Sequence, residues 1–281
     1  MPNNRFIRII PRLDIKNGQL IKGINLEGLR ILGNPFDFAK YYYETGADEI
    51  SYVDNVATLY GTNNLTKFVS KTAKNIFIPI TVGGGIRKLQ DIENMLRAGA
   101  DKICINSSAI DNKNFIKKAA KVFGCSTISA IVEFVKIDNK YYITKSNGRD
   151  IINMHPFDWA KFLQDQGAGE IILTSVLNEG LNTGFEINIT KKISSNLSIP
   201  VIAHGGAGSF EDVYNVIKKT NVKGVAIASL FHYATVGRFK YKKTKIGNFN
   251  FIKNNINKLT KKNYIRDLKK YLISKNINVR V

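Results

Sequence analysis

The feature that most constrains this chain is an internal repeat with a period of about 121 residues. GADEISYVD begins at residue 46 and GAGEIILTS at residue 167, an offset of 121. IPITVGGGI begins at residue 78 and IPVIAHGGAG at residue 199, again an offset of 121, and ICINSSA at 103–109 matches VAIASLF at 225–231. Each match joins an apolar run to a small-residue loop, so the chain reads as two halves with the same order of elements.

Short β-branched runs alternate with amphipathic stretches eight times along these halves. Strands are expected near 6–13, 48–54, 78–82, 101–106, 127–134, 170–175, 200–204 and 224–228. Helices are expected at 35–45, 63–75, 88–98, 112–122, 156–166, 185–195, 209–219 and 263–274. This order predicts a (β/α)₈ TIM barrel built from two (β/α)₄ halves. A doubly wound open sheet is the alternative, but its two halves would need different edges.

We expect a single barrel domain over residues 1–281, with half-barrels at about 1–124 and 125–281. GRFKYKKTKIGNFNFIKNNINKLTK, residues 237–261, stands before the last expected helix as a basic, aromatic-rich insertion near the top of the barrel.

Two carboxylates occupy repeat-related positions at the ends of expected strands. Asp14 lies in LDIKNG and Glu133 in VEFVKIDN, 119 residues apart and each shortly before a turn. Both should therefore lie at the C-terminal face of the barrel, where the catalytic groups of such barrels are found. Glu133 could instead be a solvated residue at a strand end. Two carboxylates across the mouth can act as general acid and general base, and the residues alone leave open which is which.

Glycine clusters also occupy matching places. Gly83-Gly84-Gly85 follows one strand and Gly205-Gly206 its repeat mate, while the Asn106-Ser107-Ser108 and Ala228-Ser229 loops precede helical segments. Glycine lets backbone amides approach an oxyanion, and helix N-termini favour anions. The repeat therefore predicts two facing phosphate sites and a long bisphosphate ligand with its reactive middle between the two carboxylates. His204, before the second cluster, either holds phosphate or packs.

Charged residues also stand at the beginnings of expected strands, on the opposite face of the barrel. They are Arg8, Glu49, Lys102 and Glu170, and the two glutamates are repeat mates. Two cations and two anions form a neutral set that could line a polar constriction in the barrel floor. Solvated strand ends are the alternative.

The composition of the chain argues against several other classes of protein. The formal net charge is +20, but lysine is spread along the chain with extra density at 238–275 and no nucleic-acid-binding motif is recognisable, so a solvated basic surface is favoured over nucleic-acid binding. There is no apolar run long enough to span a membrane and no signal-peptide pattern. Two cysteines and three separated histidines predict neither disulfides nor a metal site, and a cytoplasmic protein without a cofactor is expected.

Taken together, these motifs resemble the cyclase subunit of imidazole glycerol phosphate synthase, the HisF family. The matching stretches are LDIKNG, IKGINLEGLR, GNP, GADEI, VGGGI, GADKICINSSA, GAGEIILTS, HGGAG, IASLFH and INVRV. The resemblance implies a heterodimer in which a glutaminase (HisH-like) subunit docks on the barrel floor. Ammonia then passes the gate of Arg8, Glu49, Lys102 and Glu170.

At the mouth, the resemblance implies that ammonia reacts with a bisphosphate formimino-aminoimidazole carboxamide ribonucleotide. The products are imidazole glycerol phosphate and aminoimidazole carboxamide ribonucleotide. Asp14 and Glu133 match the catalytic positions, Asp14 as the base-like member and Glu133 as the acid-like member. The implied substrate- and phosphate-binding residues are Lys22, Asn25, Asp54, Gly85, Asn106, Ser107, Ser175, Glu179, Gly180, Gly206, Ala228 and Ser229.

The chain also departs from the family pattern at the mouth. Glu133 replaces an aspartate, Arg12 a cysteine and His204 a small residue, and Leu181 removes a hydroxyl from the loop after the strand expected at 170–175. A retained floor with a remodelled mouth suits a second branch of the family, whose members deliver ammonia to an amidotransferase for nucleotide-activated surface sugars. Such a chain would meet a sugar amidotransferase and would not turn over the histidine intermediate.

Overall fold

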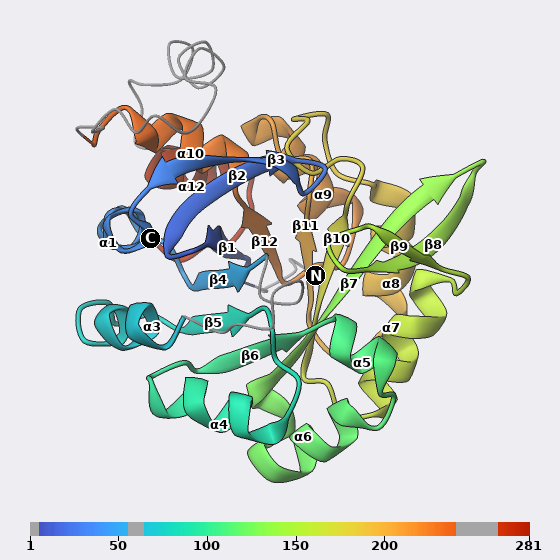
Figure 1. Cartoon of the computed structure of the whole chain (residues 1–281). Coiled ribbons are helices and arrows are strands. Elements are labelled where there is room, and N and C mark those ends of the chain that lie inside the picture. Colours follow the sequence, from blue (N-terminus) through green and yellow to red (C-terminus); the bar gives the residue numbers. More distant parts are fainter. Residues whose placement is uncertain (1–5, 56–64, 240–263) are drawn as a thin grey trace.

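A computed structural model describes residues 6–55, 65–239 and 264–281. Its central feature is a closed ring of parallel strands in the order β10-β11-β12-β1-β4-β5-β6-β7, completed by pairing of β7 with β10 (Figure 1). The barrel strands are β1 (Arg8–Lys16), β4 (Ile50–Asp54), β5 (Ile80–Gly83), β6 (Lys102–Ile105), β7 (Ile128–Ile137), β10 (Glu170–Ser175), β11 (Val201–His204) and β12 (Gly224–Ile227). The predicted (β/α)₈ barrel is confirmed.

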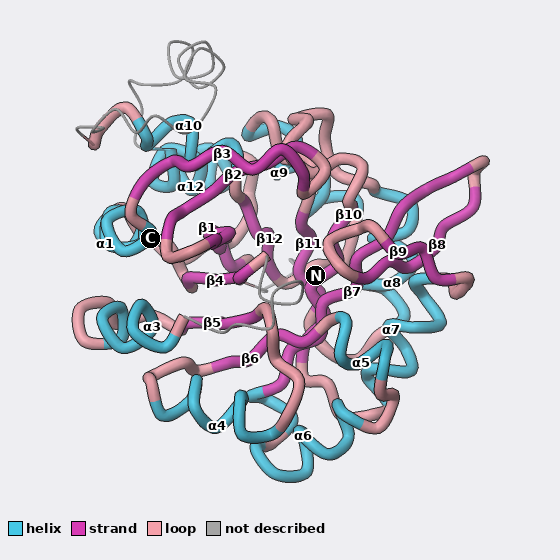
Figure 2. The backbone as a smooth tube through the Cα atoms, in the orientation of Figure 1, coloured by secondary structure: helices cyan, strands magenta, loops and turns pink. Residues whose placement is uncertain are grey.

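Helices surround this ring, as the cyan outer segments of the tube in Figure 2 show. They are α1 (Pro35–Glu44), α3 (Thr66–Ala73), α4 (Leu89–Arg97), α5 (Ser107–Asp111), α6 (Phe115–Phe123), α7 (Pro156–Asp165), α8 (Ile187–Asn196), α9 (Phe210–Lys219), α10 (Ser229–Val236) and α12 (Tyr264–Ser274). The repeat extends to helix starts: α1 and α7 each begin with proline after a residue whose side chain accepts a hydrogen bond from the second helical amide. Proline suits this position because its missing N–H would be unpaired there anyway.

Strand alternation decides which residues enter the barrel. Along β1, Arg8, Ile10, Arg12 and Asp14 point inward, while Ile9 and Leu13 join the apolar layer under the helices. One strand therefore supplies a floor residue, an apolar interior residue and two charged groups near the mouth.

The sequence analysis missed two antiparallel extensions on the mouth side of the barrel. β2 (Gln19–Ile24) and β3 (Glu27–Gly33) continue from β1, and β8 (Lys140–Lys145) and β9 (Asp150–Ile152) continue from β7 (Figure 1). These stretches were read only as turns after the strands. The short helices α5 and α10 were also expected as loops.

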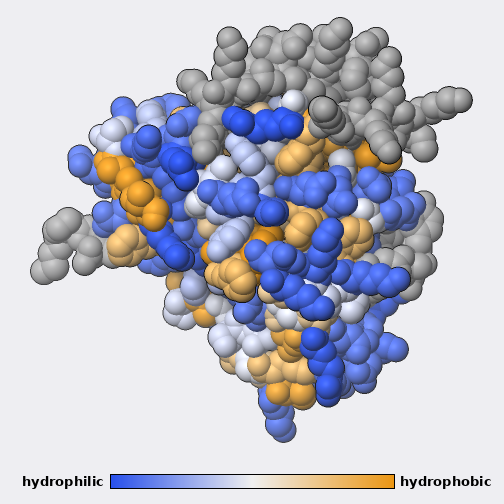
Figure 3. All heavy atoms as spheres, turned by 90° about the vertical axis from the view of Figure 1, so that its left-hand side faces the viewer, coloured by the Kyte–Doolittle hydropathy of each residue, from blue (hydrophilic) through white to orange (hydrophobic). Residues whose placement is uncertain are grey.

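The outer surface is consistent with the high net charge of the chain. The face that carries α1 and α3 is mostly hydrophilic, with small apolar patches between (Figure 3). Among the described helices, none has the length and apolarity needed to cross a membrane. Of the insertion expected at 237–261, residues 240–261 lie outside the described part of the chain.

Candidate active site

The two candidate catalytic carboxylates lie at the C-terminal ends of their strands, as expected. Asp14 lies on β1 opposite Val53 of β4, and Glu133 lies on β7 opposite Thr174 of β10. Both carboxylates are buried. A buried carboxylate needs compensation, so the groups around these two define the site.

Arg12 is the direct partner of Asp14. Its Nε donates to Asp14 Oδ1 at 3.0 Å, and the Arg12 side chain is only 2 % exposed. Asp14 and, more weakly, Glu179 and Glu133 act on the charge of Arg12, and together they outweigh its burial and raise its pKa. The guanidinium therefore compensates negative charge across the mouth.

For Glu133, burial outweighs the nearby groups that favour the charged form. Burial raises its pKa from 4.5 to about 7, although the Arg12 charge and hydrogen bonds from Asn106 and the Gly148 backbone act to lower it. Its Oε2 has no hydrogen-bond partner among the described residues. A carboxyl group with a pKa near neutrality can both hold and release a proton under working conditions.

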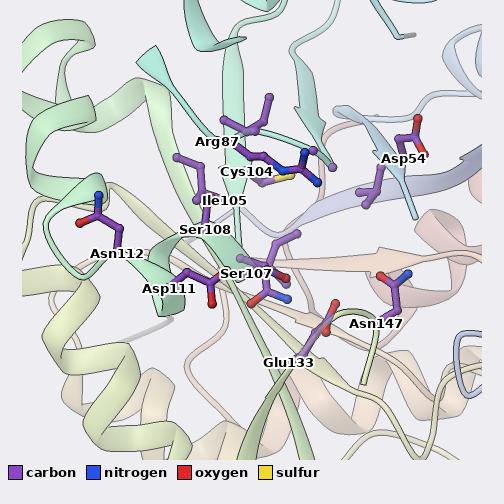
Figure 4. A pocket seen from close by; sticks show the side chains of 16 residues that line it. Asp54, Arg87, Cys104, Ile105, Ser107, Ser108, Asp111, Asn112, Glu133 and Asn147 are labelled. Atoms are coloured by element: carbon purple, nitrogen blue, oxygen red, sulfur yellow. The ribbon is translucent and has the colours of Figure 1, made fainter. Parts of the chain in front are cut away.

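Beside Glu133 lies a pocket of about 280 Å³, which we call the first cradle. Its lining includes Asp54, Gly84, Gly85 and the Asn106–Ser108 segment at the start of α5. Glu133, Ser107 and Asn147 lie around the same cavity in Figure 4. Four of the predicted substrate-binding residues, Asp54, Gly85, Asn106 and Ser107, are thus brought together beside a candidate catalytic carboxylate.

The tight turn at the first cradle, and the turn related to it by the repeat, both depend on glycine. Gly84 has φ +95° and its repeat mate Gly205 has φ +91°, and an added Cβ would meet the carbonyl of Asp54 or of Ser175. We expect Gly84→Ala and Gly205→Ala each to lower the free energy of unfolding by about 3 kcal/mol, since strained backbone costs about 1–3 kcal/mol before any clash. Urea unfolding measures this. Gly28→Ala is the control, because Gly28 has φ +61° with nothing within 4 Å of the added carbon; an equal loss there would contradict the role of close contact.

The second cradle is the repeat-related site, formed by Glu179, Gly180, Gly206, Ala228 and Ser229 with His204 and their neighbours. Its free volume is only about 10 Å³. Lys22 Nζ reaches in from β2 and contacts Glu179 Oε2 at 2.6 Å, and the Asn25 amide donates to the Glu179 carbonyl at 2.7 Å. The predicted residues Lys22, Asn25, Glu179, Gly180, Gly206, Ala228 and Ser229 are therefore brought together. Ser175, which was also predicted, is buried at the end of β10.

At the opposite end of the barrel, the four predicted floor residues form a connected ion-pair network. Arg8 contacts Glu49 at 2.7 Å and also pairs with Glu170, while Lys102 Nζ lies 2.8 Å from Glu49 and 3.3 Å from Glu170. Above the network, an interior cavity of about 10 Å³ is lined by Glu49 and Glu170 on one side and Arg12 on the other. This volume accommodates about one water molecule.

Comparison with known proteins agrees with this geometry. Residues 8–237 match the family described as histidine biosynthesis protein. The chain belongs to this family. The imidazole glycerol phosphate synthase subunit HisF of Legionella pneumophila is 48% identical over 207 residues, which cover 73% of this chain and 98% of that protein. HisF of Bacillus cereus (strain G9842) is 43% identical over 238 residues, covering 84% of this chain and 94% of its own. The resemblance inferred from the motifs is confirmed.

Within this family member, two features of the site escaped the sequence analysis. The first is the pairing of Arg12 with Asp14, which a charged residue two positions before a strand-end carboxylate could have suggested. The second is Asn147, which lines the first cradle from the turn between β8 and β9 and bonds to the Asn55 carbonyl. The alternating YYITK run before it was the available signal for a strand.

Proposed function

We propose that this chain is the cyclase subunit of an imidazole glycerol phosphate synthase. It uses ammonia to convert the bisphosphate formimino-aminoimidazole carboxamide ribonucleotide into imidazole glycerol phosphate and aminoimidazole carboxamide ribonucleotide. It is thus a lyase-type enzyme of histidine biosynthesis. The observation that carries the proposal is the pair of buried carboxylates, Asp14 and Glu133, at a mouth that also holds two repeat-related glycine cradles.

The environments of the carboxylates support different roles for them. Asp14 forms a buried ion pair with Arg12, and a carboxylate in this position is suited to accept a proton. Glu133, with its pKa raised to about 7, is suited to donate one. The cradle beside Glu133 would hold one phosphate of the substrate, so that the reacting atoms lie between the two groups.

The floor network supports a second part of the proposal, which concerns the partner. A glutaminase subunit docks at this end of the barrel and releases ammonia there. Because the four charges compensate one another and the cavity above them has room for only about one water molecule, this end of the barrel suits a small neutral molecule such as ammonia better than a hydrated ion.

Steady-state turnover of the bisphosphate intermediate, with excess ammonium salt at mildly alkaline pH, tests the proposal without the partner. Product formation by the purified chain is the expected result. A folded chain that binds a glutaminase but forms no imidazole glycerol phosphate would contradict it. The turnover assay should accompany a circular dichroism spectrum, so that an unfolded sample is recognised.

The changes at the mouth favour one second candidate. Arg12 and Glu133, together with a filled second cradle, alter the substrate pocket while the floor network is intact. In this alternative the chain delivers ammonia to an amidotransferase that acts on a nucleotide-activated surface sugar. Absence of histidine-pathway turnover, together with binding to both a glutaminase and such an amidotransferase, would support it.

A further inference from the structure

The second cradle already contains an anion that belongs to the protein. Glu179 is 1 % exposed, and its carboxylate contacts Lys22 Nζ through Oε2 and lies 3.3 Å from His204 Nε2 through Oε1. Burial by itself would raise the pKa of Glu179, but the charges of Lys22 and His204 outweigh it and hold the pKa well below its usual range. The cradle thus holds a permanent carboxylate in its free state.

His204 brings a second nitrogen group to the same place, and one of its ring nitrogens is unused. Its Nδ1 lies 3.0 Å from the carbonyl of Ala226, and its Nε2 faces the carboxylate of Glu179. Although Nε2 lies 3.3 Å from Glu179 Oε1, neither atom has a hydrogen-bond partner among the described residues, so the carboxylate leaves this ring nitrogen unsatisfied. A phosphoryl group has three oxygens and a charge of about −1.5 to −2, so it can reach Lys22 and His204 together better than a carboxylate does.

An unused donor points to the same ligand. Ser229 Oγ is buried in the second cradle and has no hydrogen-bond partner among the described residues. It stands at the first position of α10, beside backbone amides that favour an anion. The Glu179 carboxylate leaves this hydroxyl unsatisfied, whereas a phosphoryl group has three oxygens with which to reach several donors.

The second cradle is too small to hold the Glu179 carboxylate and a phosphoryl group at the same time. The free volume of about 10 Å³ suffices for about one water molecule and not for a phosphoryl group. The loop that carries Glu179 is also held down, since the Asn25 amide bonds its carbonyl and an added Cβ at Gly206 would clash with Gly184 of that loop.

We propose that the Glu179 carboxylate is an internal substitute for a phosphoryl group: it fills the second cradle of the free protein, and a phosphorylated ligand binds there only by displacing it, with Lys22 and His204 transferring to the ligand. This deepens the proposed function, on which it rests for the identity of the ligand, and it assigns His204 as a phosphate-binding residue. Glu179, predicted as a substrate-binding residue, then acts against the ligand and sets its affinity.

Inorganic phosphate tests the proposal without any turnover. Equilibrium dialysis should show one phosphate bound per wild-type chain, at the first cradle, and two per chain in Glu179→Gln, with the second site at least about tenfold tighter than in the wild type, because the competing state is removed. His204→Ala in the Glu179→Gln background should remove only the second phosphate. Glu44→Gln, an exposed residue at the end of α1, is the matched control and should bind as the wild type does. Equal binding by wild type and Glu179→Gln would overturn the proposal, as would a second site that does not depend on His204.

A second measurement avoids dependence on a variant that fails to fold. The chain has three histidines, so side-chain ¹⁵N resonances of the wild type can be assigned with His204→Ala and followed during phosphate titration. A saturable shift of the His204 ring at high phosphate is the expected result, and an unmoved resonance would overturn the proposal. Because neither readout uses the cyclase reaction, loss of the proposed function and loss of this inference are separate outcomes.

Discussion

Glu133→Gln is expected to lower turnover by about 10²–10⁴-fold, the range for removal of a positioned general acid or base. The amide has a similar shape but cannot release a proton. In the wild type, the activity that depends on protonated Glu133 should fall as pH rises above about 7, because the pKa of this carboxyl is about 7. The variant should lack this dependence in whatever activity it retains.

The same substitution should stabilise the barrel at alkaline pH. The folded pKa of about 7 lies above the ordinary value of 4.5, so protons bind more tightly to the folded chain. The contribution of this carboxyl to the free energy of unfolding is therefore complete below pH 4.5 and is lost as pH rises through about 7. Since Gln carries no charge at any pH, the variant should gain about 3 kcal/mol over the wild type across that range.

Two experiments check the two halves of this prediction. The pH dependence of turnover with ammonium salt, measured for the wild type and Glu133→Gln, reports the loss of activity. Urea unfolding of the same two proteins from about pH 4.5 to pH 8 reports the free energy of unfolding. Glu93→Gln, which alters an exposed ion pair with Arg97 on α4, is the control and should change neither by much. A Glu133→Gln chain that keeps its turnover would show that the buried carboxylate is not part of the chemistry.

The barrel could be predicted from the sequence because its determinants are local and repeated. Most strands are short β-branched runs next to a glycine or serine loop, and the repeat of about 121 residues allows each half to be compared with the other. The strands predicted at 48–54 and 170–175 are observed at Ile50–Asp54 and Glu170–Ser175. The β2–β3 extension was missed because Gly23 and Gly28 interrupt its apolar pattern, and its pairing with β1 is not visible in the local sequence.

The site was predicted only in outline, because its chemistry depends on distances between segments far apart in the chain. Repeat positions placed Asp14 and Glu133 at one face, but nothing in the sequence indicated that Lys22 would be buried against a carboxylate 157 residues away. Likewise Arg12 was recognised only as a departure from the family pattern. Its length allows it to reach along the strand to Asp14, and this contact, not the residue type, decides what it does.

Arg12→Met is expected to lower the free energy of unfolding by about 3–5 kcal/mol, the usual effect of removing one partner from a buried ion pair. Methionine fills much of the volume but leaves Asp14 as a buried carboxylate without its direct partner. Arg97→Met, at an exposed pair on α4, should cost less than about 1 kcal/mol and serves as the control. Urea unfolding at pH 7 measures both.

A double-mutant cycle separates the charge of Arg12 from its packing. Asp14→Asn in the Arg12→Met background removes the uncompensated carboxylate, so the double variant should regain part of the lost stability. The charge of Arg12 also lowers the pKa of Glu133, so Arg12→Met should shift the titration of Glu133 above about pH 7, which ¹³C NMR of the labelled carboxyl can follow. An additive cycle with an unmoved Glu133 titration would mean that Arg12 only fills space. A coupled cycle with the shift would show that the charge of this one residue, absent from the family pattern, both compensates Asp14 and limits the rise in the pKa of Glu133.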